Sequence, residues 1–459
     1  MIFQKKHLFF AVLLALFFTL FQSCEDDNGG ISIDRDTLEI NKFIHDYMEV
    51  AYFWNQEMPD YNYQKEEDPE AYFYKLLKEP DDKWSFITDD IDALNAYFEG
   101  VQKTYGFSVQ PYYLKKGSNQ VVFFVEYVYR DSPAEEAGLK RGDMFYKINN
   151  QIITDQNYQD LISDETMLLT LGIADENSNV SELSPQLSLS AVVMNIHPIV
   201  ARTTLDINGQ KIGYLAYTAF RSNYDTALVN TFQRFKEENI TDLVLDLRYN
   251  GGGDVSSAAR LAGLIAPATS KGSVFITEHW NNEMTKYFLS ENNNNEEIFT
   301  LRFPEEENNL NLARLFVLTT ASTASASEMV IYGLAPYMNV SQIGEITHGK
   351  YYGSITISDP DKKHSWAIQP IVMRSENANN SINYAEGLPP VITLVDNYYN
   401  APLGDPEEYF LSYALSEITG IPIQAPSLKA GKLLPQKIRG FKEQQDPLRQ
   451  TMIISKPEE

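Results

Sequence analysis

The chain has 459 residues, of which 43% are hydrophobic and 12% aromatic, so it is long enough for two to four domains with buried cores. Its formal net charge of -26 repels nucleic acid and anionic lipid headgroups, which excludes both as expected partners of the folded part. The only cysteine, Cys24, excludes an intramolecular disulfide and a thiolate metal site, and the six histidines show no short ligand spacing. We therefore expect no metal.

The first 23 residues have the pattern of a bacterial export signal. Lys5 and Lys6 precede an apolar run at residues 8–21, which is shorter than the ~20 residues that a membrane-spanning helix needs. A short apolar segment after a basic start is typical of a signal peptide. The sequence therefore predicts that residues 1–23 direct export.

The residues around the cysteine predict a lipid anchor. Residues 20–24 read LFQSC, which resembles the lipobox of bacterial lipoproteins, and the resemblance implies acylation of Cys24. The alternative is an ordinary signal peptide with an incidental cysteine. Residues 24–33 are acidic and form an expected flexible tether. We expect the chain to be anchored in the bacterial cell envelope, at the outer membrane or on a periplasmic face, and the acidic residues also resemble a surface-export tag.

Residues 34–97 are predicted to form a small helical domain that packs on the rest of the chain. An apolar helix face has the spacing of successive helical turns and consists of Ile44, Tyr47, Met48, Ala51 and Tyr52. A second helix is expected to open at Asp68 and Pro69, because aspartate caps helices and proline suits the first helical position.

Residues 98–197 are predicted to form a β-rich domain. A buried strand at 121–125 precedes the run SPAEEAGLKRGD at 132–143, which predicts a short helix ended by Gly138 and a turn into a strand at 144–148. This run resembles the second half of a bacterial PDZ domain.

The residues before that strand resemble the peptide-binding part of PDZ domains. Tyr105, Gly106, Phe107 and Ser108 match the loop and strand with which such domains hold a peptide end. Backbone N–H groups in the loop can bind a terminal carboxylate, and the strand edge can pair with the peptide. The alternative is that the PDZ-like domain is only a lid or a spacer.

Residues 198–420 alternate between strands and helices, which predicts an α/β core with a largely parallel sheet. Strands are expected at 211–217, 242–247, 315–319 and 340–346, and helices at 226–238, 255–265 and from Ser325 or Ser327. Residues 291–310, rich in asparagine and glutamate, are predicted to be an exposed insertion. The tail at 421–459 lacks periodicity, and no function is predicted for it.

Two strand–helix junctions carry candidate chemistry. Residues 246–253 read DLRYNGGG, and three glycines let the backbone approach a ligand with its N–H groups pointing outward. Residues 319–328 read TTASTASASE and place serines at a helix N-terminus, where an oxyanion can be stabilised. Alone, each motif could also be a simple turn or a helix start.

Together, and behind a PDZ-like segment, these junctions resemble the carboxy-terminal processing (tail-specific) serine peptidases. That family carries DLRxNGGG, then SxSASE, then a GK element. Here the serine before Ala-Ser-Glu is Ser325, and Lys350 follows it by 25 residues, the spacing of that family. The resemblance implies a core of the ClpP/crotonase type.

The resemblance also implies a mechanism. A desolvated Lys350 acts as general base and Ser325 as nucleophile, with the oxyanion bound by the N–H of Ala326 and that of Gly251 or Gly252. Arg248 and Asn250 are expected to brace the glycine loop. No metal or organic cofactor is required.

Some positions depart from the family pattern. Ser354 stands four residues after the lysine, where the family often has a glutamine, and the turn at 387–391 lacks the family acid. His348 offers a weaker serine–histidine alternative. Glu328 is expected to favour the first turn of its helix rather than to act in catalysis.

The sequence thus predicts a serine endopeptidase that acts on exported polypeptides, recruited through a PDZ-like domain that can hold their C-termini. One alternative is a catalytically silent peptide- or ligand-binding lipoprotein on the same fold. A crotonase-type acyl-CoA enzyme shares broad α/β features but explains neither the PDZ-like segment nor the serine–lysine spacing.

Overall fold

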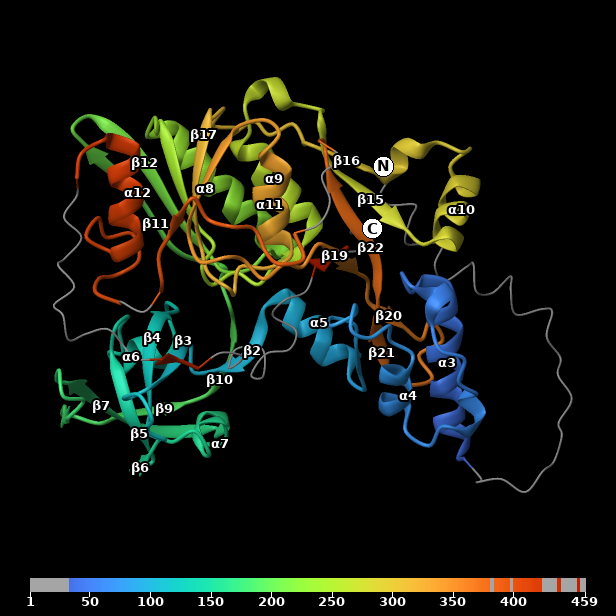
Figure 1. Cartoon of the computed structure of the whole chain (residues 1–459), viewed down its shortest axis with the longest axis horizontal. Coiled ribbons are helices and arrows are strands. Elements are labelled where there is room, and N and C mark those ends of the chain that lie inside the picture. Colours follow the sequence, from blue (N-terminus) through green and yellow to red (C-terminus); the bar gives the residue numbers. More distant parts are fainter. Residues whose placement is uncertain (1–32, 380–383, 397–398, 423–435, 439–451, 455–459) are drawn as a thin grey trace, which may run out of the picture.

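The computed structural model describes residues 33–379, 384–396, 399–422, 436–438 and 452–454 (Figure 1). The predicted export signal, Cys24 and most of the tether lie outside these residues. Within the described part of the chain, no helix combines the length and apolarity needed to cross a membrane.

The amino-terminal region is helical, as expected, and it is fastened to the core by a strand. Its helices are α3 (Arg35–Ala51), α4 (Pro69–Lys75) and α5 (Ile91–Glu99). The predicted apolar face of α3 is buried, and Asp68 caps α4 with Pro69 at its start. Between α4 and α5, the strand β1 (Phe86–Thr88) pairs antiparallel with β21 (Ala367–Gln369). This pairing brings the segment before β1 into the middle of the molecule.

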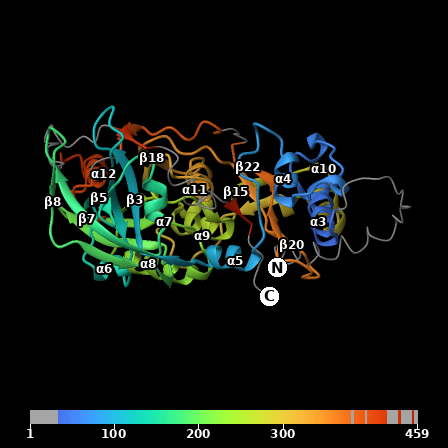
Figure 2. The ribbon, with the colours of Figure 1, turned by 90° about the horizontal axis from the view of Figure 1, so that it is seen from below.

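The PDZ-like region forms its own sheet around a separate apolar core. The main strands run in the order β3 (Phe107–Tyr113), β4 (Val121–Val128), β5 (Met144–Ile148), β7 (Thr166–Ala174) and β8 (Val180–Glu182). The predicted short helix is α6 (Pro133–Glu136), and Gly138 follows it at a positive φ. Figure 2 shows this sheet and the helix α3 at opposite ends of the molecule.

The core sheet is largely parallel, which confirms the predicted fold class. Its strands are β11 (Ile199–Ile207), β12 (Gln210–Tyr217), β13 (Asp242–Asp246), β17 (Arg314–Thr319), β18 (Asn339–Gly344) and β23 (Ile392–Thr393). Only β11 pairs antiparallel with its neighbour. One face packs against α8 (Asp225–Glu237), α9 (Val255–Ile265) and α11 (Ala326–Leu334), and the other against α12 (Tyr409–Thr419).

A second sheet was not predicted. Its strand order is β14 (Gly253–Asp254), β25 (Met452–Ile453), β19 (Tyr352–Ser354), β22 (Ile371–Asn377), β15 (Val274–Trp280) and β16 (Thr300–Arg302). The prediction of an exposed insertion at 291–310 is therefore wrong in part. That segment supplies β16, and its apolar residues Ile298 and Phe303 are buried against the main core although polar residues dominate the composition.

A buried group of charges joins the PDZ-like region to the core. Arg141 reaches out of the β-rich domain, and its Nη2 lies 2.8 Å from Glu408 Oε1. Its Nη1 also donates to the hydroxyl of Tyr249, which in turn donates to Asp396. Arg248 Nη1 lies 2.9 Å from the same Glu408 oxygen. Arg248 of the glycine loop and Arg141 of the PDZ-like region therefore bind the same carboxylate oxygen of Glu408.

Candidate active site

Ser325 occupies a strained turn at the start of α11, between β17 and that helix. Its φ is +62° and its ψ is −116°, a backbone conformation that costs a non-glycine residue about 1–3 kcal/mol. The side chain is fully buried, and its Oγ has no hydrogen-bond partner in the described part of the chain. A strained backbone and an unsatisfied buried hydroxyl together mark Ser325 as a functional candidate. The nearby Ser327 differs, because its hydroxyl donates to the carbonyl of Asn250.

Glu328 links the serine to the lysine. Its Oε2 accepts hydrogen bonds from the backbone N–H of Ser325 at 2.8 Å and of Lys350 at 2.9 Å. Its Oε1 accepts from the hydroxyl of Thr347 at 2.6 Å and the N–H of Gly349 at 2.7 Å. The backbone N–H groups of the two predicted catalytic residues, Ser325 and Lys350, therefore donate to the same oxygen atom of Glu328. Glu328 does lie in the first turn of α11, as expected, but the sequence did not predict that it would hold both residues.

Glu328 is itself deeply buried. Burial raises the pKa of its carboxyl group to about 7, although the four donors that it accepts favour the charged form. Gly349 lies beside it at a φ of +97°, where a Cβ would lie 2.3 Å from the carbonyl oxygen of Ala385. A glycine is therefore required immediately before the lysine.

Lys350 is only 1% exposed, so its amine is removed from water. Burial lowers the pKa of Lys350 from 10.5 to about 7, and the negative charges of Asp82 and Glu328 oppose this shift. The Nζ atom lies 5.8 Å from the centre of the Trp84 ring. A buried amine with a pKa near 7 has the property that a general base needs at physiological pH.

The region before β1 supplies a wall of this site, which the sequence did not predict. Asp82 is buried, and its Oδ1 accepts from the backbone N–H of Trp84 at 3.0 Å and of Ser85 at 2.9 Å. The hydroxyl of Ser85 in turn accepts from the N–H of Ile371 in β22. The amino-terminal helical region is thus more than a cap, because it carries a carboxylate whose charge acts on Lys350.

We expect the Asp82→Asn variant to shift the pH dependence of activity. Asparagine keeps an oxygen for the two backbone donors but removes the negative charge that raises the pKa of Lys350. The pKa of the Lys350 amine should then fall below its wild-type value of about 7. The acidic limb of the kcat/KM profile should therefore move to lower pH. Asp81→Asn is the matched control, because the neighbouring Asp81 side chain is 53% exposed and pairs with Lys78. An unchanged acidic limb in Asp82→Asn would show that this charge does not act on the base.

The glycine loop lies against the serine turn. The carbonyl of Asn250 accepts from the N–H of Ala324 and from the hydroxyl of Ser327, which fastens the two junctions together. The Asn250 side chain accepts from the N–H of Gly252 at 2.9 Å and donates to the carbonyl of Tyr217 at 3.0 Å. Gly252 therefore already uses its N–H group, and of the two alternatives Gly251 is left, with Ala326, as a candidate oxyanion donor.

Arg248 and Ser354 occupy supporting positions. Arg248 is fully buried and pairs with Asp246 at 2.6 Å and with Glu408 at 2.9 Å, in keeping with a bracing role. Ser354 Oγ accepts from Nε2 of Gln369 at 3.0 Å. The glutamine that contacts Ser354 thus comes from β21 and not from the fourth residue after the lysine.

His348 faces the aromatic side of the site. Its Nε2 lies 3.5 Å from Nε1 of Trp84, and its backbone N–H donates to the carbonyl of Thr323. These contacts place the ring beside Trp84, and none of them supports the serine–histidine alternative.

A groove of about 800 Å³ joins the PDZ-like region to the glycine loop. Three of the four predicted peptide-binding residues line it, namely Tyr105, Phe107 and Ser108, together with Gly251, Gly252 and Gly253. Gly106 is instead packed on α6, since a Cβ there would lie 2.1 Å from the Cβ of Ser132. Ser325 and Lys350 are not among the described residues that line the groove, in keeping with their burial.

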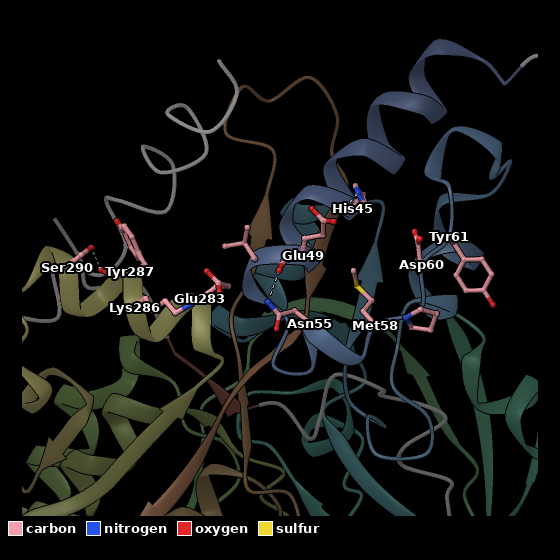
Figure 3. Close-up of a pocket in the computed structure, with 12 residues that line it drawn as sticks. His45, Glu49, Asn55, Met58, Asp60, Tyr61, Glu283, Lys286, Tyr287 and Ser290 are labelled. Atoms are coloured by element: carbon pink, nitrogen blue, oxygen red, sulfur yellow. Dashed lines mark hydrogen bonds and ion pairs between the residues drawn. The ribbon is translucent and has the colours of Figure 1, made fainter. Parts of the chain in front are cut away.

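A second cavity lies between α3, the segment that follows it and α10 (Asn282–Glu291), as Figure 3 shows. Its lining includes His45, Glu49, Met58, Tyr61 and Lys286. None of the site residues predicted from the sequence lines it. In the described part of the chain, no three histidine, cysteine, aspartate or glutamate side chains are grouped as a metal site would require.

Comparison with known families identifies this arrangement. A model of peptidase family S41 matches residues 211–381, which include both junctions and Lys350, and a model of the S41 N-terminal domain matches residues 39–86. The chain therefore carries a segment, residues 211–381, that matches peptidase family S41. A PDZ domain model also matches residues 124–171, which confirms the predicted PDZ resemblance.

Two proteins of similar sequence are named as carboxyl-terminal processing proteases. The carboxyl-terminal-processing protease of Synechocystis is 26% identical over 227 residues, covering 48% of this chain and 47% of that protein. The carboxy-terminal processing protease CtpA of Bacillus subtilis is 26% identical over 313 residues, covering 65% and 58%. The chain therefore spans only about half the length of these relatives. A solved structure described as a putative S41 protease from Bacteroides fragilis matches with a TM-score of 0.69 and 26% identity, over 87% of this chain and 99% of that one.

Proposed function

We propose that this chain is a serine endopeptidase that hydrolyses polypeptides with Ser325 and Lys350. The neutral amine of Lys350 takes the proton of the Ser325 hydroxyl, and Oγ attacks the scissile carbonyl carbon. The N–H groups of Gly251 and Ala326 stabilise the resulting oxyanion. Lys350 returns its proton to the leaving amine, and water then releases the second product from the acyl-enzyme.

One observation carries this proposal: a single buried carboxylate binds the main chains of both residues. Glu328 Oε2 accepts from the N–H of Ser325 and of Lys350, so the two backbone nitrogens lie within two hydrogen-bond lengths of each other. The depressed pKa of Lys350 supports the same assignment, because an amine titrating at about 7 is available as a base. Proteins similar to this chain are named carboxyl-terminal-processing proteases, which also supports a peptidase.

The Ser325→Ala variant tests the proposal directly. With purified protein that begins at residue 25 and an unfolded polypeptide substrate, we expect Ser325→Ala to reduce kcat/KM by about 10⁴-fold or more. A fluorophosphonate probe should label the wild-type chain and not the variant. Ser322→Ala is the matched control, because Ser322 lies in the same loop and uses its backbone N–H rather than its hydroxyl in the contact to Thr320. Equal cleavage by Ser325→Ala would contradict the proposal, and peptide binding without labelling would indicate a catalytically silent binding protein instead.

We also propose that the PDZ-like domain recruits the polypeptide. The groove lined by Phe107, Ser108 and the glycine loop supports a continuous path from the domain to the site. A strand edge next to a loop can bind the C-terminal end of a peptide. Peptides with a free C-terminal carboxylate should therefore be cleaved with a lower KM than the same peptides with a C-terminal amide, and equal KM values would contradict this part.

A lipid anchor at Cys24 is the proposed attachment to the cell envelope. The sequence at 20–24 supports it through its resemblance to a lipobox, behind the signal-like residues 1–23. Fractionation of cells that produce the full chain should place it in the membrane pellet, whereas Cys24→Ser should release it to the soluble fraction. A Cys24→Ser chain that stays in the pellet would exclude this anchor.

A further inference from the structure

The C-terminal segment returns to the PDZ-like domain at the edge predicted to bind peptides. The strand β24 (Gln436–Lys437) pairs antiparallel with β3, opposite Tyr112 and Tyr113. The pairing continues with the N–H of Ile438 donating to the carbonyl of Pro111 at 3.0 Å. The same β3 strand begins with Phe107, Ser108 and Val109, which line the groove.

The direction of this pairing is that of a peptide ligand. Because β24 is antiparallel to β3, the chain from residue 436 to 438 runs toward the beginning of β3, where the loop at Tyr105 and Gly106 lies. A peptide whose C-terminal end is held by that loop would pair with β3 in the same direction. The side chain of Gln110 also donates to the carbonyl of Ile438 at 2.9 Å, which fixes the register.

A second piece of the C-terminal segment lies between the two catalytic elements. The strand β25 pairs with β14, placing Met452 opposite Gly253 and Ile453 opposite Asp254. On its other edge, Ile453 pairs with Ser354 in β19, and the N–H of Ile454 donates to the carbonyl of Ser354 at 3.2 Å. β14 directly follows the glycine loop, and β19 follows Lys350. β25 therefore forms backbone pairs with both β14 and β19, the two strands next to the site.

The side chains of β25 and of the residue after it add to this contact. Ile453 is one of the residues that line the groove, beside Gly251 and Gly252. Ile454 is 5% exposed and belongs to the main apolar core. The segment is thus seated by backbone pairing on two sides and by a buried isoleucine, while Ser325 and Lys350 are both closed off from solvent.

From these contacts we propose that the C-terminal segment, residues 436–438 and 452–454, occupies the path of the substrate and acts as a tethered inhibitor. The inference rests on the peptidase function proposed above. A tethered segment competes at an effective concentration of about the millimolar range, which a free peptide substrate must exceed or displace. The substrate class that displaces it is an extended polypeptide that can pair with β3 and with the edges of β14 and β19. The competing explanation is that β25 is only a structural strand that completes the second sheet.

The test uses the full chain with one substitution that releases β25. Ile454→Asp places a charge where a buried isoleucine packs, so β25 should leave its sheet. The matched control is Ile421→Asp, the same change at a residue that is 40% exposed near the start of the tail. For a short peptide substrate, we expect Ile454→Asp to raise kcat/KM at least fivefold, mainly through a lower KM, and Ile421→Asp to leave it unchanged. If Ile454→Asp does not fold, as judged by its thermal unfolding, Ile454→Ala takes its place with the same expected direction.

A binding measurement separates this inference from the proposed function. A fluorescent synthetic peptide of residues 446–459 is titrated into the Ser325→Ala full chain, with and without Ile454→Asp. We expect the peptide to bind the released chain at least tenfold more tightly, because the site is then vacant. Tighter binding without any cleavage by the Ser325-containing chain would sustain the inference and refute the peptidase. Equal binding, or a folded Ile454→Asp chain with lower kcat/KM, would overturn the inference and show that β25 is structural.

Discussion

The Lys350→Met variant is expected to lose about 10³- to 10⁴-fold in kcat/KM while keeping its fold, since general-base catalysis contributes an effect of this size. The Lys350 side chain is only 1% exposed, so its replacement must fill the same space. Methionine has a similar volume and no ionisable group, so the variant removes the proton acceptor and little else. The measurement is kcat/KM on an unfolded polypeptide, with circular dichroism to confirm folding. Lys362→Met is the matched control, because it makes the same change at an exposed lysine. A Lys350→Met chain with near wild-type activity would exclude Lys350 as the base.

We also expect Lys350→Met to become more stable relative to wild type as the pH is lowered from about 10 to 7. The folded-state pKa of Lys350 is about 7, below the ordinary 10.5, so between these values the unfolded chain binds more protons. Protonation therefore disfavours the folded wild-type chain increasingly as the pH falls from about 10 toward 7. The unfolding temperature of Lys350→Met relative to wild type should accordingly rise over that interval as the pH is lowered. A difference that is constant from pH 10 to pH 7 would show that the amine is not desolvated in the folded chain.

The Glu328→Gln variant is expected to lose both stability and activity. Each carboxylate oxygen accepts two hydrogen bonds, from Ser325 and Lys350 on one side and from Thr347 and Gly349 on the other. Whichever way a glutamine amide turns, its NH₂ group faces two donors. Leaving a buried donor unsatisfied costs about 1–3 kcal/mol, so we expect the free energy of unfolding to fall by roughly 2–4 kcal/mol.

The activity of Glu328→Gln should fall further than its stability explains. Its carboxylate binds the main chains of both proposed catalytic residues, and a small displacement of a reacting group costs about 10²-fold in rate. Chemical denaturation gives the stability and kcat gives the activity, both compared with Glu283→Gln on the exposed side of α10, where the glutamate side chain is 53% exposed. A Glu328→Gln chain with the stability and kcat of wild type would show that the carboxylate does not position the pair.

The parts of the site that were predictable from sequence are those set by local pattern. The strand before the glycine loop and the helix after it were predicted, and the helix matches its predicted bounds of 255–265. A helix from Ser325 or Ser327 was also expected, because small residues and a serine follow an apolar strand, and α11 begins between the two, at Ala326. These elements depend on neighbours in the chain, and a parallel sheet then brings the ends of its strands to one edge.

What could not be predicted depends on contacts between distant residues. Asp82 and Gln369 reach the site because β1 pairs with β21, and no local periodicity in either segment indicates that pairing. The role of Glu328 was missed for a similar reason, since three of its donors come from residues 347–350. The tail was assigned no function because strands of two residues are too short to give a pattern, although both β24 and β25 are paired.

The pairing of Phe86 with Gln369 has a consequence for when the molecule becomes active. Contacts between residues far apart in the chain form late, after the intervening segments have been made and folded. Asp82 and its neighbours emerge early in synthesis, but the pocket that surrounds the amine closes only when β21 arrives. An incomplete chain that ends before β21 therefore lacks the pairing that places Asp82 beside the proposed base, and we expect the proposed hydrolytic activity to appear only after β21 has been made.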